Sequence, residues 1–242
     1  MGTGAGGRAG TRRTDVAFAA ALVLVLLLWN NVVVHRVPGG RGAYVAVNVA
    51  AAGVLLAAAR VTGSSWADLG LARRAVPAGL RWGGAALGLV AAGYAAALAL
   101  PAVRPLLADA RVAGLGWGDV AGDVLVRIPL GTVLWEEVAF RGVLLAVLLR
   151  VLPLPAATGL AAVVFGLWHV RPTIGGLDAN DLADGTAARI GAVALACAGT
   201  AVAGVLFTWL RLRSGSLLAP ALLHLATNTL GTVAAAVAHR LG

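Results

Sequence analysis

The chain has 242 residues, of which 60% are hydrophobic and 12% are charged, and its mean hydropathy is +0.90. This composition excludes a soluble globular domain and predicts an integral membrane protein, because a soluble domain cannot keep so much apolar surface away from water. The formal net charge of +9 is the balance of 19 basic residues, all of them arginine, and 10 acidic residues. They lie mainly between apolar segments, where arginines set orientation and contact anionic headgroups. We therefore expect the lipid bilayer, and no nucleic acid, as a partner.

Seven apolar segments approach the length of about 20 residues that a membrane-spanning helix needs. In chain order they lie near 16–34, 43–61, 80–103, 120–149, 154–170, 187–210 and 217–238. The first follows three arginines and lacks a clear small-residue cleavage site, which indicates an uncleaved signal anchor. We predict an all-α, polytopic transmembrane helix bundle of about seven spans, with residues 1–242 forming a single integral membrane domain.

The distribution of arginines predicts the orientation of this bundle. In a seven-span arrangement, the arginines of 8–13, 60–81, 150 and 211–213 fall on one side, which should be cytoplasmic. The N-terminus is then inside. The absence of lysine, with abundant Ala, Gly, Val and Leu, is typical of GC-rich bacteria, so we expect the bacterial cytoplasmic membrane. The joint 62–76 fits either an interfacial amphipathic helix or a solvated connector.

The only two glutamates of the chain are neighbours, Glu136 and Glu137, inside the fourth apolar segment. Carboxylates within a membrane are costly and are usually functional. Glu137 and Arg141 are four residues apart and share a helix face, in the order that favours an ion pair. Glu136 points about a quarter turn away and lacks this partner. The spacing predicts a structural role for Glu137 and a chemical role for Glu136, although both acids could serve only to hold helices together.

Two further helices carry polar residues one turn apart. Phe165 precedes His169 by four residues in the fifth segment, and His224 precedes Asn228 by four residues in the last. Alone, each pair would more often be a satisfied core residue or interhelical glue. Together with Glu136 they lie on three separate spans, and a shared polar cavity within the membrane would satisfy all of them. We expect such a cavity to open toward the cytoplasm or toward lipid.

These residue types support hydrolysis of an acyl bond in either of two ways. Glu136, His169 and His224 could hold zinc or another divalent metal that activates water. Alternatively, Glu136 is a general base, His169 orients the water, and His224 with Asn228 stabilises the oxyanion. The chain contains neither a His-Glu-x-x-His nor a Gly-x-Ser-x-Gly motif.

Three motifs in this order, Glu-Glu-x-x-x-Arg, Phe-x-x-x-His and His-x-x-x-Asn, resemble the CAAX-protease and bacteriocin-processing intramembrane endopeptidases, also called the Abi family. The resemblance covers about 132–232. It implies an endopeptidase acting on a peptide or membrane-protein substrate. The catalytic set would be Glu136, His169, His224 and Asn228. The supporting set would be Glu137, Arg141 and Phe165.

Two other functions fit the same residues. The chain could be a non-catalytic membrane scaffold or bacteriocin-immunity factor that keeps the motifs for structure, or a small proton-coupled transporter. Depth is a further question, because a fifth span that ends at Val170 would place His169 near the outer surface, far from His224. The fifth helix should therefore extend beyond Pro172, start deeper or tilt. The residues predict no particular oligomeric state.

Overall fold

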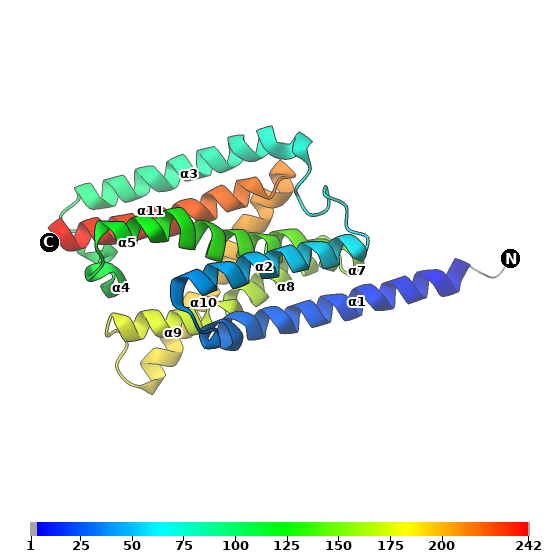
Figure 1. Ribbon diagram of the computed structural model, residues 1–242, viewed down its shortest axis with the longest axis horizontal. Coiled ribbons are helices and arrows are strands. Elements are labelled where there is room, and N and C mark those ends of the chain that lie inside the picture. The colour runs from blue at the N-terminus through cyan, green and yellow to red at the C-terminus, as the bar shows by residue number, and fades with distance from the viewer. Residues whose placement is uncertain (1–3, 242) are drawn as a thin grey trace.

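The computed structural model describes residues 4–241, with side chains from residue 13 onward, and in this part of the chain every regular element is helical (Figure 1). The first three long helices are α1 (Gly4–Leu28), which continues through a π turn (Trp29–Val33) and a 3-10 turn (Val34–Arg36), α2 (Gly40–Val61) and α3 (Val76–Ala99). Short α4 (Ala110–Ala113) and α5 (Trp117–Gly122) follow. The last helices are α8 (Leu154–Trp168), α9 (Val170–Ala179), α10 (Thr186–Ser214) and α11 (Leu218–Leu241).

Within the described residues, six helices are long and apolar enough to cross a membrane, which indicates an integral membrane protein. They cover Arg13–Arg36, Gly40–Val61, Arg73–Ala99, Leu154–Ala179, Thr186–Ser214 and Leu218–Leu241. Each corresponds to one of the seven predicted segments. The chain termini lie at opposite ends of the long axis (Figure 1). The orientation in the membrane stays a prediction, and the side chains of Arg8 and Arg12, on which it partly rests, lie outside the described residues.

The fourth predicted segment differs from the other six. Residues 117–151 are helical throughout, but α-helical turns alternate with two π-helical stretches, Asp123–Leu134 (η5) and Val138–Leu144 (η6). Between them lies the short α6 (Trp135–Glu137), and α7 (Leu145–Val151) ends the segment. Pro129 lies inside η5, and its missing N–H and bulky ring disturb regular α-helical bonding. Five charged residues within 120–149 also separate this segment from the apolar spans. Its second half is buried inside the protein.

The fifth segment is longer than predicted and contains a break. Helix α8 ends at Trp168, His169 has φ −91° and ψ 4°, and α9 then continues past Pro172 to Ala179. Two carbonyl groups freed at the break accept side-chain amides from the first span: Asn30 Nδ2 donates to Trp168 O at 2.9 Å, and Asn31 Nδ2 donates to Leu167 O at 3.1 Å. The predicted end at Val170 was therefore wrong, and the alternative of a helix extending beyond Pro172 is confirmed.

Close helix contacts hold the domain around this break. Gly166 of α8 lies against α10, so that a Cβ atom there would be 2.6 Å from the Cys197 carbonyl oxygen. The largest buried cluster combines side chains of α1, α2, the 135–148 segment and α8. Residues 62–76 form turns and a 3-10 helix, with Ser64 and Leu69 fully buried. This joint is thus neither an amphipathic helix nor a fully solvated connector.

Candidate active site

The Glu137 side of the acid pair is an ion pair enclosed by aromatic rings. Arg141 Nη1 donates to Glu137 Oε1 at 3.1 Å, and the two side chains are 2% and 1% exposed. The guanidinium carbon lies 3.9 Å from the ring centroid of Phe165 and 4.7 Å from that of Phe207, a geometry in which a cation and an aromatic face attract. The predicted pair is confirmed, and Phe165 contacts its guanidinium; the supporting role of these residues stays a prediction.

Glu136 has a different set of neighbours, drawn from three elements. Its Oε1 atom accepts a 3.0 Å hydrogen bond from Trp168 Nε1. Its Oε2 atom is buried without a hydrogen-bond partner and lies 4.0 Å from His169 Nε2 and 3.8 Å from His224 Nε2. These separations exceed a direct hydrogen bond, but a water molecule can bridge groups at such spacing. Arg141 pairs with Glu137, and Glu136 is hydrogen-bonded to Trp168 instead.

The orientation of both imidazoles is set by their other ring nitrogen. His169 Nδ1 lies 2.8 Å from the carbonyl oxygen of Phe165, and a carbonyl can only accept, so Nδ1 carries the proton. His224 Nδ1 lies 2.8 Å from Glu137 Oε1, which likewise directs Nε2 toward Glu136. Glu137 therefore contacts both Arg141 and His224. The sequence pattern did not predict the link to His224.

Three of the four predicted catalytic residues line one polar cavity of about 540 Å³: Glu136, His169 and Asn228. His224 is buried behind them and reaches the cavity through its contact with Glu136. Asn228 lies one turn from His224 and donates through Nδ2 to the His224 carbonyl oxygen at 3.2 Å. The structure thus brings Glu136, His169 and His224 together, with Asn228 on the same cavity wall, so His169 is not far from His224. Their catalytic roles stay a prediction.

The cavity wall also includes charged residues from the start of α2 and from the 109–127 segment. Asp123 accepts from Arg127 at 2.7 Å, and Arg41 lies 3.2 Å from Asp119. Hydrogen bonds from Arg111 hold the pKa of Asp109 at about 2, below its ordinary value. The start of α2 and the short helices α4 and α5 lie toward the end of the bundle opposite the start of α1 (Figure 1). The direction in which the cavity opens, toward the cytoplasm or toward lipid, stays a prediction.

The tentative metal set is not assembled as a metal site. Two ligands of one tetrahedral zinc ion lie about 3.3–3.4 Å apart, because each is about 2.0–2.1 Å from the metal. Glu136 Oε2 lies farther than this from both histidines. Within the described residues, no group of three or more His, Cys, Asp and Glu side chains could hold a metal ion. This geometry does not fit zinc at Glu136, His169 and His224.

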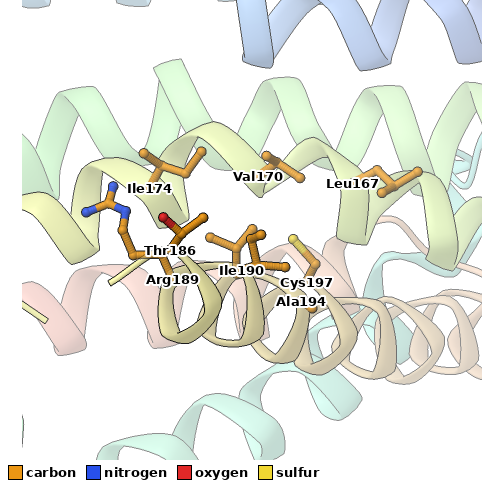
Figure 2. A pocket seen from close by; sticks show the side chains of 9 residues that line it. Leu167, Val170, Ile174, Thr186, Arg189, Ile190, Ala194 and Cys197 are labelled. Atoms are coloured by element: carbon orange, nitrogen blue, oxygen red, sulfur yellow. The ribbon is translucent and has the colours of Figure 1, made fainter. Parts of the chain in front are cut away.

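A second hollow, of about 500 Å³, lies between the α8–α9 segment and α10 and is almost entirely apolar (Figure 2). Leu167, Val170 and Ile174 face Ile190 and Ala194 across it, and Cys197 lies at one end. It borders the turn that carries His169, but it contains none of the four predicted catalytic residues. Of its lining residues, only Arg189 is charged.

Sequence reasoning missed Trp168 and Asn30. Trp168 is next to a singled-out histidine and is 1% exposed. Asn30 is one of two adjacent asparagines within an apolar span. A polar side chain in such a span is costly unless it has a partner, and that cost was the available signal.

The fold and the site together define a helical membrane protein with a buried carboxylate flanked by two imidazoles on the wall of a polar cavity. Residues 123–230 match the model of the family described as Type II CAAX prenyl endopeptidase Rce1-like. Residues 123–230 are thus similar to an Rce1-like CAAX endopeptidase domain, from a family of peptide-bond hydrolases, and the resemblance of the three motifs is confirmed over these residues. The match begins before the predicted 132. No curated protein and no solved structure matches the chain.

Proposed function

We propose that this protein is an intramembrane endopeptidase in which Glu136 activates the water that attacks a peptide bond. The observation that carries the proposal is the position of Glu136 Oε2, which faces the Nε2 atoms of two histidines on a cavity wall. Two apolar spans and the 117–151 segment deliver these groups, and such an arrangement within a membrane is costly unless it is used. The family match supplies the reaction class.

In the proposed reaction, a water molecule lies between Glu136 Oε2 and His169 Nε2. Glu136 takes one proton while the water oxygen bonds to the peptide carbonyl carbon. His169 accepts a hydrogen bond from the other water proton, because its Nδ1–H is committed to the Phe165 carbonyl. The C–N bond then breaks, and Glu136 returns its proton to the departing amine nitrogen.

The oxyanion would be stabilised by His224 and Asn228, which lie one turn apart on α11. His224 Nε2 donates when the ring carries both protons, and the Glu137 carboxylate at Nδ1 complements that charge. Asn228 has a second amide proton beyond the one given to the His224 carbonyl. A donor already aimed at the developing charge stabilises the transition state without reorganising.

We infer that residues 1–242 act as one integral membrane domain, with 117–151 as a seventh span. The helices outside the matched region pack directly onto it: α1 contacts α7 and α8, α2 contacts η5, and α3 contacts α11. The charged side chains of 120–149 then face protein and the polar cavity, where polar groups are tolerated at membrane depth. The substrate would be a peptide or a membrane protein that reaches this cavity, in a bacterial cytoplasmic membrane.

The test is cleavage of a quenched peptide library by detergent-purified protein, with metal content measured on the same samples. Wild type should cleave without stoichiometric metal, whereas Glu136→Gln, His169→Ala and His224→Ala should remain folded and lose turnover. Stoichiometric metal that disappears with activity in all three variants would contradict the metal-free mechanism. Folded wild-type protein without cleavage of the library or of membrane-protein substrates would instead favour the scaffold or immunity function.

A further inference from the structure

The environment of Trp168 differs from that of every other polar neighbour of Glu136. The indole is 1% exposed and packs against Trp135 and Phe140 of the 135–148 segment. The Trp168 ring centroid lies 6.2 Å from that of Trp135 and 5.3 Å from that of Phe140. Its Nε1–H is directed at Glu136 Oε1 at 3.0 Å. An indole has one donor and no acceptor. This donor is therefore committed to one oxygen of the proposed base.

The hydrogen bond decides how the Glu136 carboxylate is turned. The last torsion of a glutamate side chain is broad, so an unheld carboxylate samples many rotations. With Oε1 held by Trp168, Oε2 is the oxygen that faces His169 and His224. The base is then oriented before substrate binds, and orientation of a reacting group is a large part of enzymatic rate enhancement.

Trp168 is itself fixed from the backbone. Its carbonyl oxygen accepts the buried amide of Asn30, which belongs to the first span and lies outside the matched residues 123–230. The next residue, His169, begins the helix break. Trp168 thus connects the first span, the helix break at His169 and the proposed base Glu136.

We propose that Trp168 is a positioning residue that holds the Glu136 carboxylate in its reactive rotation. The proposal rests on the proposed function for its kinetic consequence. Trp168 acts through Glu136, and the cavity-lining set does not include it. Its removal should therefore lower kcat and leave KM nearly unchanged.

Trp135 provides a matched control within the same aromatic cluster. It is 3% exposed, it precedes Glu136 directly, and its buried Nε1 atom has no hydrogen-bond partner. Trp168→Phe and Trp135→Phe remove the same atoms from one cluster, but only the first removes a hydrogen bond. Loss of outer-shell support for metal-ligating residues typically lowers activity roughly 10–100-fold, and we expect a loss of that order for the support of Glu136.

The experiment compares kcat and KM of the two variants on a peptide cleaved by wild type, with thermal unfolding midpoints measured in parallel. We expect Trp168→Phe to lose roughly 10–100-fold in kcat at unchanged KM, with Trp135→Phe close to wild type. Equal losses in the two variants, or a loss confined to KM, would overturn the proposal. Inactive wild type would overturn the proposed function. The contact between Trp168 and Glu136 would then be tested by the spectroscopic measurement that follows.

A second measurement does not require activity or a folded Trp168 variant. The indole ¹⁵N–H resonances of tryptophan-labelled protein are compared between wild type and Glu136→Ala, with the Trp135→Phe spectrum assigning the control signal. Removing the carboxylate should move the Trp168 resonance far more than the Trp135 resonance, since only Trp168 loses its acceptor. Similar shifts for both indoles would show that Trp168 does not hold Glu136.

Discussion

The two sides of the acid pair differ in what their surroundings allow. On the Glu137 side, one carboxylate oxygen receives both Arg141 and His224, and the guanidinium lies against aromatic rings. On the Glu136 side, one oxygen is held by Trp168 and the other faces two imidazole nitrogens on a cavity wall. Adjacent, chemically identical side chains thus become a structural group and a reactive group. Charge neutralisation and access to the cavity make the difference.

The largest expected effect on turnover comes from removing the Glu136 carboxylate, which faces the cavity. Glu136→Gln keeps the shape of the side chain and an acceptor for Trp168, but it removes the base. General base catalysis is worth about 10²–10⁴-fold, so we expect a loss of that order in kcat with an unchanged unfolding midpoint. Peptide cleavage and thermal unfolding in detergent check this. Turnover near the wild-type value would make another group the base.

Disrupting the buried ion pair of Glu137 and Arg141 should instead lower the stability of the fold. Arg141→Met leaves Glu137 buried with only His224 as partner, and removing one member of a buried ion pair costs about 3–5 kcal/mol. The double substitution Glu137→Gln/Arg141→Met removes both charges and should be less destabilised than Arg141→Met alone. Denaturant unfolding of the two variants provides the comparison. A double variant as unstable as the single one would show that the charges are not the cause.

Much of this division was visible in the sequence. The i, i+4 spacing of Glu137 and Arg141 predicted the ion pair, and the cost of intramembrane polar groups predicted that Glu136, His169, His224 and Asn228 would converge. The helix break at His169 was not predicted, although Pro172 has no N–H to donate to the Trp168 carbonyl. Its bonding to Asn30 and Asn31, more than 130 residues away, could not be inferred from local sequence. The alternation of α and π turns in 117–151, and the direction of the cavity, likewise depend on tertiary packing.

A smaller effect should follow from disturbing the packing of α8, the helix that positions His169 next to Glu136. A Cβ atom at Gly166 would meet the Cys197 carbonyl oxygen at 2.6 Å, whereas Gly159 of the same helix has open space around it. Gly166→Ala should lose about 1–3 kcal/mol through overpacking and also lose turnover. Gly159→Ala should gain up to about 1 kcal/mol from helix propensity. Unfolding midpoints of both variants test this prediction. Equal stability of the two variants would contradict the close contact between Gly166 and the Cys197 carbonyl.

The smallest expected effect concerns the outer part of the cavity. The pKa of Asp109 lies at about 2 in the folded protein, chiefly through hydrogen bonds from Arg111. A depressed carboxyl pKa stabilises the folded state above the unfolded value of about 3.9, and this contribution disappears as pH falls toward 2. The unfolding midpoint of wild type should decline over that window slightly more than that of Asp109→Asn. Identical declines would remove Asp109 as a contributor.

The most direct measurement of the proposed division places Glu136→Gln and Glu137→Gln side by side, with turnover and unfolding midpoint determined on the same preparations. We predict that Glu136→Gln is as stable as wild type and has lost turnover, whereas Glu137→Gln is markedly destabilised because buried Arg141 has lost its countercharge. Equal stability of the two variants, or retained turnover in Glu136→Gln, would contradict the assignment of chemistry to one carboxylate and structure to the other.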